Sequence, residues 1–587
     1  MALRVKWLVQ DQGVNPEAIT VITFTAEAAL NMRHRLSDEE KTDVYMPRDQ
    51  QPSQISTMHS LGLQIISNNY QSLGLDEKFK VLDSDSLKRL LFEDSAQLAG
   101  ALRSQGIAAN DIKVHGIRIN KEHELYKITQ YYNTILKACN FIDFDDLILL
   151  SSVLLISNAV LRAQYQGRAK HLLVDEYQDI NQSQYEFIRL LADKDSSGLF
   201  AVGDDDQSIY SFRGGSPEFV RRFKEDYGEK AQILEIPLCR RCPSAVLNGA
   251  LSVVTTFNPE RLPKVAPTFS STVKTPIQML SSPSDEKEAS FIAGKCSRVT
   301  PSHDVLILVP HLSFAKPIIV ALRQKRVAYN CRTILAEEGF FSLDVLGHWL
   351  SNPADNLALR QTIQFLIETD NFGVPSKRVR KAEKIAEREK YLAELASLWE
   401  VVIKEKCSLY EAVKINAPKS TFIANILSAL DALVTGYATP ASEFIDVLRK
   451  TFLPWGKSSD MFQEISTWID EIKGRGVAGQ GTVRIMSMRL AKGLEADYVF
   501  VVGLEENVFP RQESTTTKLS EASRLFFVSM TRAKLELYLC HSRTRSASHT
   551  YLPNSYALQP SPFLSVLPKD VINKIYLPAD SKVKEKK

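Results

Sequence analysis

Short apolar runs that end in polar residues recur along this chain. The first is Ile19–Thr23, and a polar turn and an amphipathic stretch follow it. Runs of this length, rich in β-branched residues, predict central strands of parallel sheets with helices on both faces. The sequence therefore predicts an α/β fold whose ligands bind beyond the carboxyl ends of the strands. The same pattern recurs in HLLVDEYQD (171–179), GLFAVGDDDQS (198–208), HDVLILVPH (303–311) and DYVFVVGLEE (497–506).

Two long stretches, 62–140 and 345–475, have a mostly helical pattern instead, and we interpret them as insertions into two α/β lobes. We predict an amphipathic helix at residues 2–12 that ends at Gly13. The uncharged run 147–161 predicts a buried helix. We expect the first lobe at 1–61 and 135–225, its helical insertion at 62–134, the second lobe at 226–345 and 476–570, its helical insertion at 346–475, and a disordered tail at 571–587.

Composition narrows the picture only a little. The net charge of +3 is too mild to establish or exclude a nucleic-acid partner. The N-terminus lacks the apolar core of a signal peptide, and the run 147–161 is short for a membrane span. Cys239 and Cys242 form a lone CxxC without a second pair at zinc-ligand spacing, so no metal site is predicted from them. Few cysteines without a disulfide framework favour a cytoplasmic location.

Polar residues after two of the predicted strands suggest a metal and nucleotide site. Asp175 at the end of a strand can hold Mg²⁺, and Glu176 beside it can orient and deprotonate a water molecule. The alternative is a strand-ending acid pair that faces solvent. Gln207, just past another strand, can sense a γ-phosphate. Tyr210 and Phe212 can offer stacking faces to bases, or simply pack in a glycine-rich turn.

Seven segments in order resemble the motifs of the UvrD/Rep family of superfamily 1 DNA helicases. The resemblance runs from residue 2 to about 540, so it covers almost the whole chain. The segments are TFTAEAALNMRHRL (23–36), STMHSLG (56–62), NFIDFDDLI (140–148), VDEYQDIN (174–181), GDDDQSIYSFRGG (203–215), RIMSMRLAKGLEADYVFVVGLEE (484–506) and RLFFVSMTRAKLELYL (524–539).

This resemblance implies two RecA-like lobes of the P-loop NTPase type with ATP and Mg²⁺ between them. It implies an ATP-dependent helicase that moves 3′ to 5′ on single-stranded and partially duplex DNA, in repair or recombination. The implied catalytic residues are Glu176 as base, Asp175 as Mg²⁺ ligand, Gln207 and the arginine finger Arg532. The implied ATP contacts are Arg241, Glu495, Gln207 and Arg532. The implied DNA contacts are Thr23, Phe24, Thr25, Thr57, His59, Ser60, Tyr210, Phe212 and Lys492.

The chain departs from the family pattern in the fourth motif, which reads IPLCRRCPSAV (236–246). Arg241 stands at the position of the family's arginine, whereas Arg240 replaces the tyrosine that stacks on adenine. Arg489 replaces the usual histidine of the fifth motif. Phe212 stands where the family often has tryptophan, and its stacking role is expected to survive because any π-face serves.

A second departure concerns the phosphate cradle, Gly-x-x-x-x-Gly-Lys-[Ser/Thr], whose backbone amides and lysine hold the phosphates. The only Gly-Lys-[Ser/Thr] segment is 456–458, with Thr451 at the position of the first glycine and no buried strand before it. It therefore reads as a polar loop. The family places its cradle at the start of the helix before the Ile19–Thr23 strand, so the matching lysine and threonine would fall before Met1.

Three hypotheses follow from this second departure. The first is a helicase whose start has been placed too late. The second is a shortened relative that binds single-stranded DNA without hydrolysing ATP, and the third is a scaffold for protein interactions. Retention of the site residues favours the first hypothesis; these are Asp175, Glu176, Gln207, Arg241 and Arg532.

Overall fold

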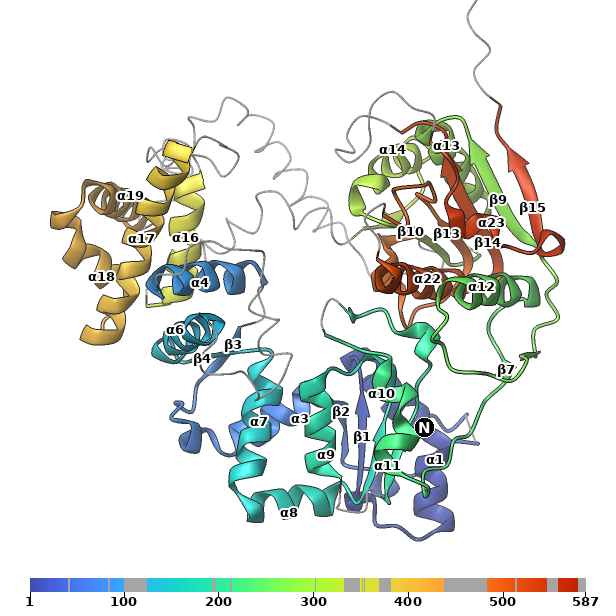
Figure 1. Cartoon of the computed structure of the whole chain (residues 1–587), viewed down its shortest axis with the longest axis horizontal. Coiled ribbons are helices and arrows are strands. Elements are labelled where there is room, and N and C mark those ends of the chain that lie inside the picture. Colours follow the sequence, from blue (N-terminus) through green and yellow to red (C-terminus); the bar gives the residue numbers. More distant parts are fainter. Residues whose placement is uncertain are drawn as a thin grey trace, which may run out of the picture.

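The structure is a computed structural model of the chain. It describes residues 1–40, 43–82, 85–99, 124–192, 197–211, 214–300, 302–331, 349–350, 352, 354–368, 382–437, 483–511, 515–545 and 558–578. Within these residues two parallel sheets form two lobes, and helical segments lie to one side of both (Figure 1). The predicted α/β class with two parallel-sheet lobes is confirmed.

The first lobe is built on a sheet of four parallel strands with a hydrophobic core on each face. In order across the sheet the strands are β2 (Gln54–Thr57), β1 (Ile19–Thr23), β5 (His171–Val174) and β6 (Leu199–Ala201). One core involves α1 (Ala2–Lys6) and α2 (Ala26–Ser37). The other involves α3 (Met58–Ser67), α7 (Asp146–Ser157), α8 (Ala159–Arg168) and α9 (Gln182–Leu191). Because all four strands are parallel, the residues that follow them meet at one edge.

Two helices of this lobe differ from the expected ones. The predicted helix at 2–12 begins as α1 and continues as a π-helical turn, Trp7–Asp11, before Gly13. The predicted helix at 147–161 is broken at Asn158, whose side chain accepts from Leu161 N and so caps a new helix, α8. Among the described residues no single helix is long and apolar enough to cross a membrane. Taken together, α7 and α8 are long and apolar enough, but the two helices are bent by 114° relative to each other.

The second lobe is built on seven parallel strands. In order they are β11 (Tyr329–Asn330), β12 (Val483–Ser487), β10 (Val305–Val309), β13 (Ala496–Val501), β14 (Ala533–Ser542), β9 (Ile277–Ser282) and β15 (Ile572–Tyr576). One face packs on α12 (Ser244–Phe257) and α22 (Thr516–Met530), and the other on α13 (Asp285–Val299) and α14 (Lys316–Gln324). All five residues of β10 are buried, as its continuous apolar run predicts.

The expected disordered tail at 571–587 is wrong for its first part. Residues 572–576 form β15, which pairs with β9 from Ile572 opposite Ile277 to Tyr576 opposite Ser281. Ile572 and Ile575 pack on the hydrophobic cores of the second lobe, and the pairing satisfies the open edge of β9. Residues 579–587 lie outside the described part of the chain.

The two insertions share a single hydrophobic core. The first contributes β3 (Lys80–Leu82), α4 (Asp85–Leu98), α6 (Glu124–Ala138) and β4 (Phe141–Asp143). The second contributes α16 (Asn356–Glu368), α17 (Ala382–Glu405), α18 (Leu409–Asn416) and α19 (Thr421–Tyr437). Leu91 and Tyr132 from the first insertion and Trp399 from the second belong to the same buried cluster. In Figure 1 α4 lies directly beneath α16, so the insertions form one body.

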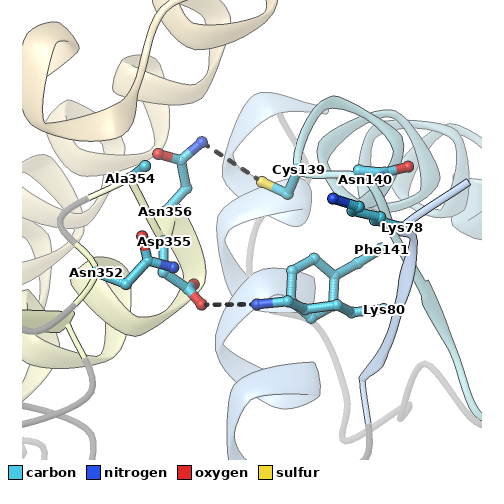
Figure 2. A pocket seen from close by; sticks show the side chains of 9 residues that line it. All are labelled: Lys78, Lys80, Cys139, Asn140, Phe141, Asn352, Ala354, Asp355 and Asn356. Atoms are coloured by element: carbon cyan, nitrogen blue, oxygen red, sulfur yellow. Dashed lines mark hydrogen bonds and ion pairs between the residues drawn. The ribbon is translucent and has the colours of Figure 1, made fainter. Parts of the chain in front are cut away.

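A buried polar cluster crosses the contact between the insertions. Asp94 of α4 accepts hydrogen bonds from Arg360 Nε at 2.8 Å and Arg360 Nη2 at 2.7 Å, and from Trp399 Nε1 at 2.8 Å. All three residues are almost fully buried. A polar pocket of about 140 Å³ opens nearby, and in Figure 2 Lys80 and Cys139 on one side face Asp355 and Asn356 on the other. The pocket therefore lies in the contact between the two insertions.

Candidate functional site

Asp175 and Glu176 lie directly after β5, at the carboxyl edge of the first sheet. Asp175 N donates to Ile22 O at 2.9 Å, which continues the strand pairing for one more residue. Glu176 has a φ of 53°, a left-handed conformation that is uncommon for a residue with a side chain. Backbone strain of this kind clusters at active sites and supports a functional role for Glu176.

The surroundings of the acid pair favour a bound cation. Burial raises the pKa of Asp175, and the neighbouring Glu176 carboxylate raises it further, whereas the amino group of Met1 and Lys492 oppose the rise. Asp179 is buried as well, and its Oδ1 accepts no hydrogen bond from the described residues. Carboxylate oxygens are the ligands that Mg²⁺ prefers, and Asp179 Oδ1 is buried without a partner in the described part of the chain, so the residues present fit that ion.

Lys492 of the second lobe reaches into this acidic edge of the first. Its Nζ lies 3.1 Å from Glu176 Oε2, forms an ion pair with Asp179, and donates to Gln207 O at 2.9 Å. The Lys492 side chain is only 5% exposed. The structure thus places Lys492 against carboxylates between the lobes, and its expected role as a DNA contact stays a prediction.

Gln178 connects the acid pair to the loop after β6. Its Nε2 donates to Glu176 Oε2 at 2.5 Å, and its Oε1 accepts from Asp204 N at 3.0 Å. Gln207 then donates to Asp204 Oδ2 at 2.8 Å. A continuous chain of hydrogen bonds therefore joins Glu176 to Gln207. Sequence reasoning did not assign Gln178 a role, although it lies in the same motif as Asp175 and Glu176.

Basic residues hold the three acids of the loop after β6. Lys264 Nζ lies 2.8 Å from Asp205 Oδ1, and Arg261 Nη2 lies 2.5 Å from Asp206 Oδ2. Burial alone would raise the pKa of Asp206, but Arg261 and Lys264 outweigh it and lower the pKa. Lys264 also binds Asp204 and Asp206, so the cluster is neutralised by protein cations and does not offer a metal site.

Two arginines of the second lobe are expected ATP contacts, and the charge of one of them, Arg532, interacts with that of Glu176. Arg241 Nε lies 2.9 Å from Glu495 Oε2, with both side chains partly exposed. Arg532 is almost fully buried and donates to Val528 O at 2.8 Å and Leu494 O at 3.2 Å. Burial, reinforced by Arg241, lowers the pKa of Arg532 to about 10. Its hydrogen-bond acceptors are all uncharged, so a nearby anion would stabilise the charge of this guanidinium.

The expected DNA contacts form two aromatic pairs at the same edge of the first sheet. The rings of Phe24 and Tyr210 stack with centroids 5.0 Å apart, and those of His59 and Phe144 with centroids 4.0 Å apart. Phe144 was missed by sequence reasoning, although a phenylalanine between two acids, Asp143 and Asp145, was a visible signal; the structure shows that Phe144 is 42% exposed.

The three expected threonine contacts have local structural roles. Thr23 is buried and donates to Thr25 O at 3.0 Å. The Thr25 and Thr57 hydroxyls accept from backbone amides and cap α2 and α3. Phe212 and the Gly-Lys-Ser segment at 456–458 lie outside the described residues.

Comparison with known proteins identifies the family of the chain. Two family models match: the UvrD/REP helicase N-terminal domain over residues 1–228 and the UvrD-like helicase C-terminal domain over residues 457–544. The ATP-dependent DNA helicase Rep of Escherichia coli is 28% identical, over 97% of this chain and 90% of its own length. DNA helicase II of Haemophilus influenzae is 26% identical, over 98% of this chain and 84% of its own. The ATP-dependent DNA helicase PcrA of Leuconostoc citreum is 25% identical, over 98% of this chain and 81% of its own length. The chain belongs to the UvrD/Rep family of superfamily 1 helicases.

Proposed function

We propose that this protein is an ATP-dependent DNA helicase that moves 3′ to 5′ on single-stranded DNA and unwinds duplexes in cytoplasmic DNA repair or recombination. One observation carries the proposal: Glu176 at the end of β5 in one lobe pairs with Lys492 of the other lobe, and its charge also interacts with that of Arg532. Phosphoryl transfer needs this combination of a metal ligand, a base and positive charge. The direction of movement and the pathway rest on the family resemblance.

The first lobe supplies the groups that act on water and metal. Asp175 would hold Mg²⁺, which supplies positive charge to the phosphate oxygens when it is bound. Glu176 orients the attacking water and accepts its proton. Gln178, hydrogen bonded to Glu176, fixes the orientation of that carboxylate and links it to the loop that carries Gln207. Movement at Gln207 would therefore reach Glu176 through Asp204 and Gln178.

The second lobe supplies charge to the departing phosphate. Arg532 is buried among neutral acceptors, so its charge is available to an anion that enters the cleft. Arg241 and Glu495 pair with each other at the same edge, and we assign them contacts to the phosphate and the ribose. Because these groups and Glu176 belong to different lobes, hydrolysis would couple to a change in the distance between the lobes.

The aromatic pairs supply the contact with DNA. The rings of Phe24 and Tyr210 follow strands of the first sheet, and His59, just after β2, stacks on Phe144, which follows β4. Bases of any sequence stack on the π-faces of such rings, which suits a motor that steps along a strand. Tyr210 also lies under the Lys492 ammonium, 5.6 Å from its ring centroid, so the aromatic pair adjoins the acidic edge.

A second candidate is a relative that binds single-stranded DNA without hydrolysing ATP. The observation in its favour is the pair of aromatic stacks, which can bind bases whether or not ATP is hydrolysed. The deciding experiment measures ATP turnover with and without single-stranded DNA, and unwinding of duplexes that carry a 3′ or a 5′ tail. Turnover stimulated by DNA, with unwinding from the 3′ tail, supports the helicase. Salt-dependent DNA binding without turnover would support the second candidate and overturn the first.

A further inference from the structure

Two cysteines flank the arginine that we assign to the phosphate. Cys239 ends the short strand β7 (Leu238–Cys239), and Cys242 lies two residues before α12. Cys239 is half-buried, and its Sγ lies 4.0 Å from Cys242 O. Cys242 is buried, and its Sγ lies 3.3 Å from Thr531 O, the residue before Arg532. A tight turn therefore carries two neighbouring thiols, with Arg240 and Arg241 between them.

Cys239 differs from the buried cysteines of the chain, including Cys242, whose thiol has a raised pKa because it is hydrogen bonded to Cys239 and buried. Burial raises the pKa of the thiols of Cys139 and Cys296 to about 12, as expected for packed structural cysteines. In contrast, the hydrogen bond from the Cys242 thiol lowers the pKa of Cys239 to about 5, with backbone amides and Arg241 contributing. A partly exposed thiolate beside a second thiol is the arrangement that undergoes thiol–disulfide exchange.

We propose that Cys239 and Cys242 are a redox-active pair whose reversible disulfide is a modification site at the edge of the nucleotide cleft. The oxidant is a small-molecule disulfide. The Cys239 thiolate attacks one of its sulfur atoms, its S–S bond breaks, and one thiolate leaves. Cys242 then loses its proton to solvent and attacks Cys239 Sγ, which expels the second thiolate. The two cysteines lose two electrons and the oxidant gains two.

The disulfide has a consequence for catalysis that rests on the proposed function. The bond closes a ring across residues 239–242 and fixes the backbone that carries Arg241. It also draws Cys242 Sγ away from Thr531 O, next to Arg532. Both arginines that we assign to the phosphate are therefore displaced by one covalent change. Oxidation is expected to lower ATP turnover by about tenfold or more, the size expected for a misplaced charge contact.

Peptide mass spectrometry of the full chain tests the pair directly. The protein is equilibrated with oxidised glutathione, free thiols are blocked, and trypsin is added without reductant. Trypsin cuts after Arg240 and Arg241, so the oxidised pair leaves two peptides joined by a disulfide. The joined peptides should form, disappear with dithiothreitol, and be absent from Cys239→Ser and Cys242→Ser. The matched control Cys407→Ser, a half-buried cysteine of the second insertion, should retain them.

The outcomes separate this inference from the helicase function. A stable mixed disulfide on Cys239, or two unmodified thiols, would overturn the redox pair. If the joined peptides form but ATP turnover is the same in the oxidised and the reduced chain, the proposed effect of the disulfide on Arg241 is overturned. Joined peptides in a chain without turnover in either state would support the pair and count against the proposed helicase instead.

Discussion

The Lys492 ammonium of the second lobe lies 3.1 Å from Glu176 Oε2 of the first lobe. The same ammonium pairs with Asp179 and donates to the backbone carbonyl of Gln207. Asp179 is fully buried and Lys492 nearly so, which makes this an ion pair shielded from solvent. One lysine therefore contacts two carboxylates of the first lobe and ties the lobes together.

Lys492→Ala is expected to destabilise the protein by about 3 kcal/mol, because it leaves a buried carboxylate without its cation. The measurement is urea unfolding followed by circular dichroism. Lys534→Ala is the matched control, since Lys534 pairs with Asp497 in a partly exposed setting and should change stability by less than about 1 kcal/mol. Equal losses of stability in the two variants would contradict the importance of the buried ion pair of Lys492.

Glu176→Gln is expected to lower ATP hydrolysis by about 10²–10⁴-fold, because an amide cannot accept the proton of the attacking water. Binding of single-stranded DNA should be spared, since the assigned DNA contacts belong to other residues. ATP turnover and fluorescence anisotropy measure the two effects. Glu186→Gln on α9 makes the same change of charge away from the acid pair and should keep full turnover. Retained turnover in Glu176→Gln would exclude Glu176 as the base.

Tyr210→Ala is expected to weaken binding of single-stranded DNA by about 1–3 kcal/mol, because a stacking face is lost. Phe24→Ala should have a similar effect, and the double variant should lose less than the sum, since the two rings stack on each other. Titrations of labelled oligothymidine at one fixed salt concentration measure the affinities. Tyr576→Ala, an exposed tyrosine on β15, is the control. Full additivity of Phe24 and Tyr210 would show that they contact DNA independently.

The sequence predicted local features of the fold well and distant pairings poorly. The strand Ile19–Thr23 was placed correctly, because a continuous apolar run before a polar turn is a local signal. The position of Asp175 after a strand followed from the same signal. The break at Asn158 was missed because one polar residue scarcely alters an otherwise apolar run. β15 was missed because its edge pairing with β9 depends on the tertiary fold.

The site was predicted only in part for the same reason. Motif resemblance named Glu176 and Lys492, but no local pattern says that they pair across the lobes. Lys264 was missed altogether, although it holds the acids that follow β6. Its contacts depend on a loop that returns from α12, and nothing in the sequence around Lys264 marks that return. Charge pairs between distant segments thus need the structure.

Asp94→Ala is expected to loosen the contact between the two insertions, because Arg360 and Trp399 lose a shared buried acceptor. Removal of one partner from a buried ion pair costs about 3–5 kcal/mol. Hydrogen exchange should become faster in α4, α16 and α17 but not in α12, which belongs to the second lobe. Glu405→Ala, at an exposed position of α17, should leave all four helices unchanged. Unchanged exchange in Asp94→Ala would show that the apolar core alone holds the insertions together.

Alkylation of Cys239 is expected to have an unusual dependence on pH. Its pKa is lowered to about 5 by the hydrogen bond from the Cys242 thiol, with backbone amides and Arg241 contributing. Cys239 is thus thiolate throughout the neutral range, and its rate with iodoacetamide should be nearly flat between about pH 6.5 and 8.5. The Cys407 thiol, whose pKa burial raises, should react about tenfold faster for each pH unit.

The shape of the curve is the test, because a thiolate of low pKa reacts more slowly at its plateau than one of high pKa. Peptide mass spectrometry follows both sites in one reaction. Cys242→Ser replaces the thiol donor by a hydroxyl, and Cys242→Ala removes it. If the hydrogen bond lowers the pKa, the flat profile should persist in Cys242→Ser more than in Cys242→Ala. A Cys239 rate that climbs with pH in the wild type, as at Cys407, would contradict the lowered pKa.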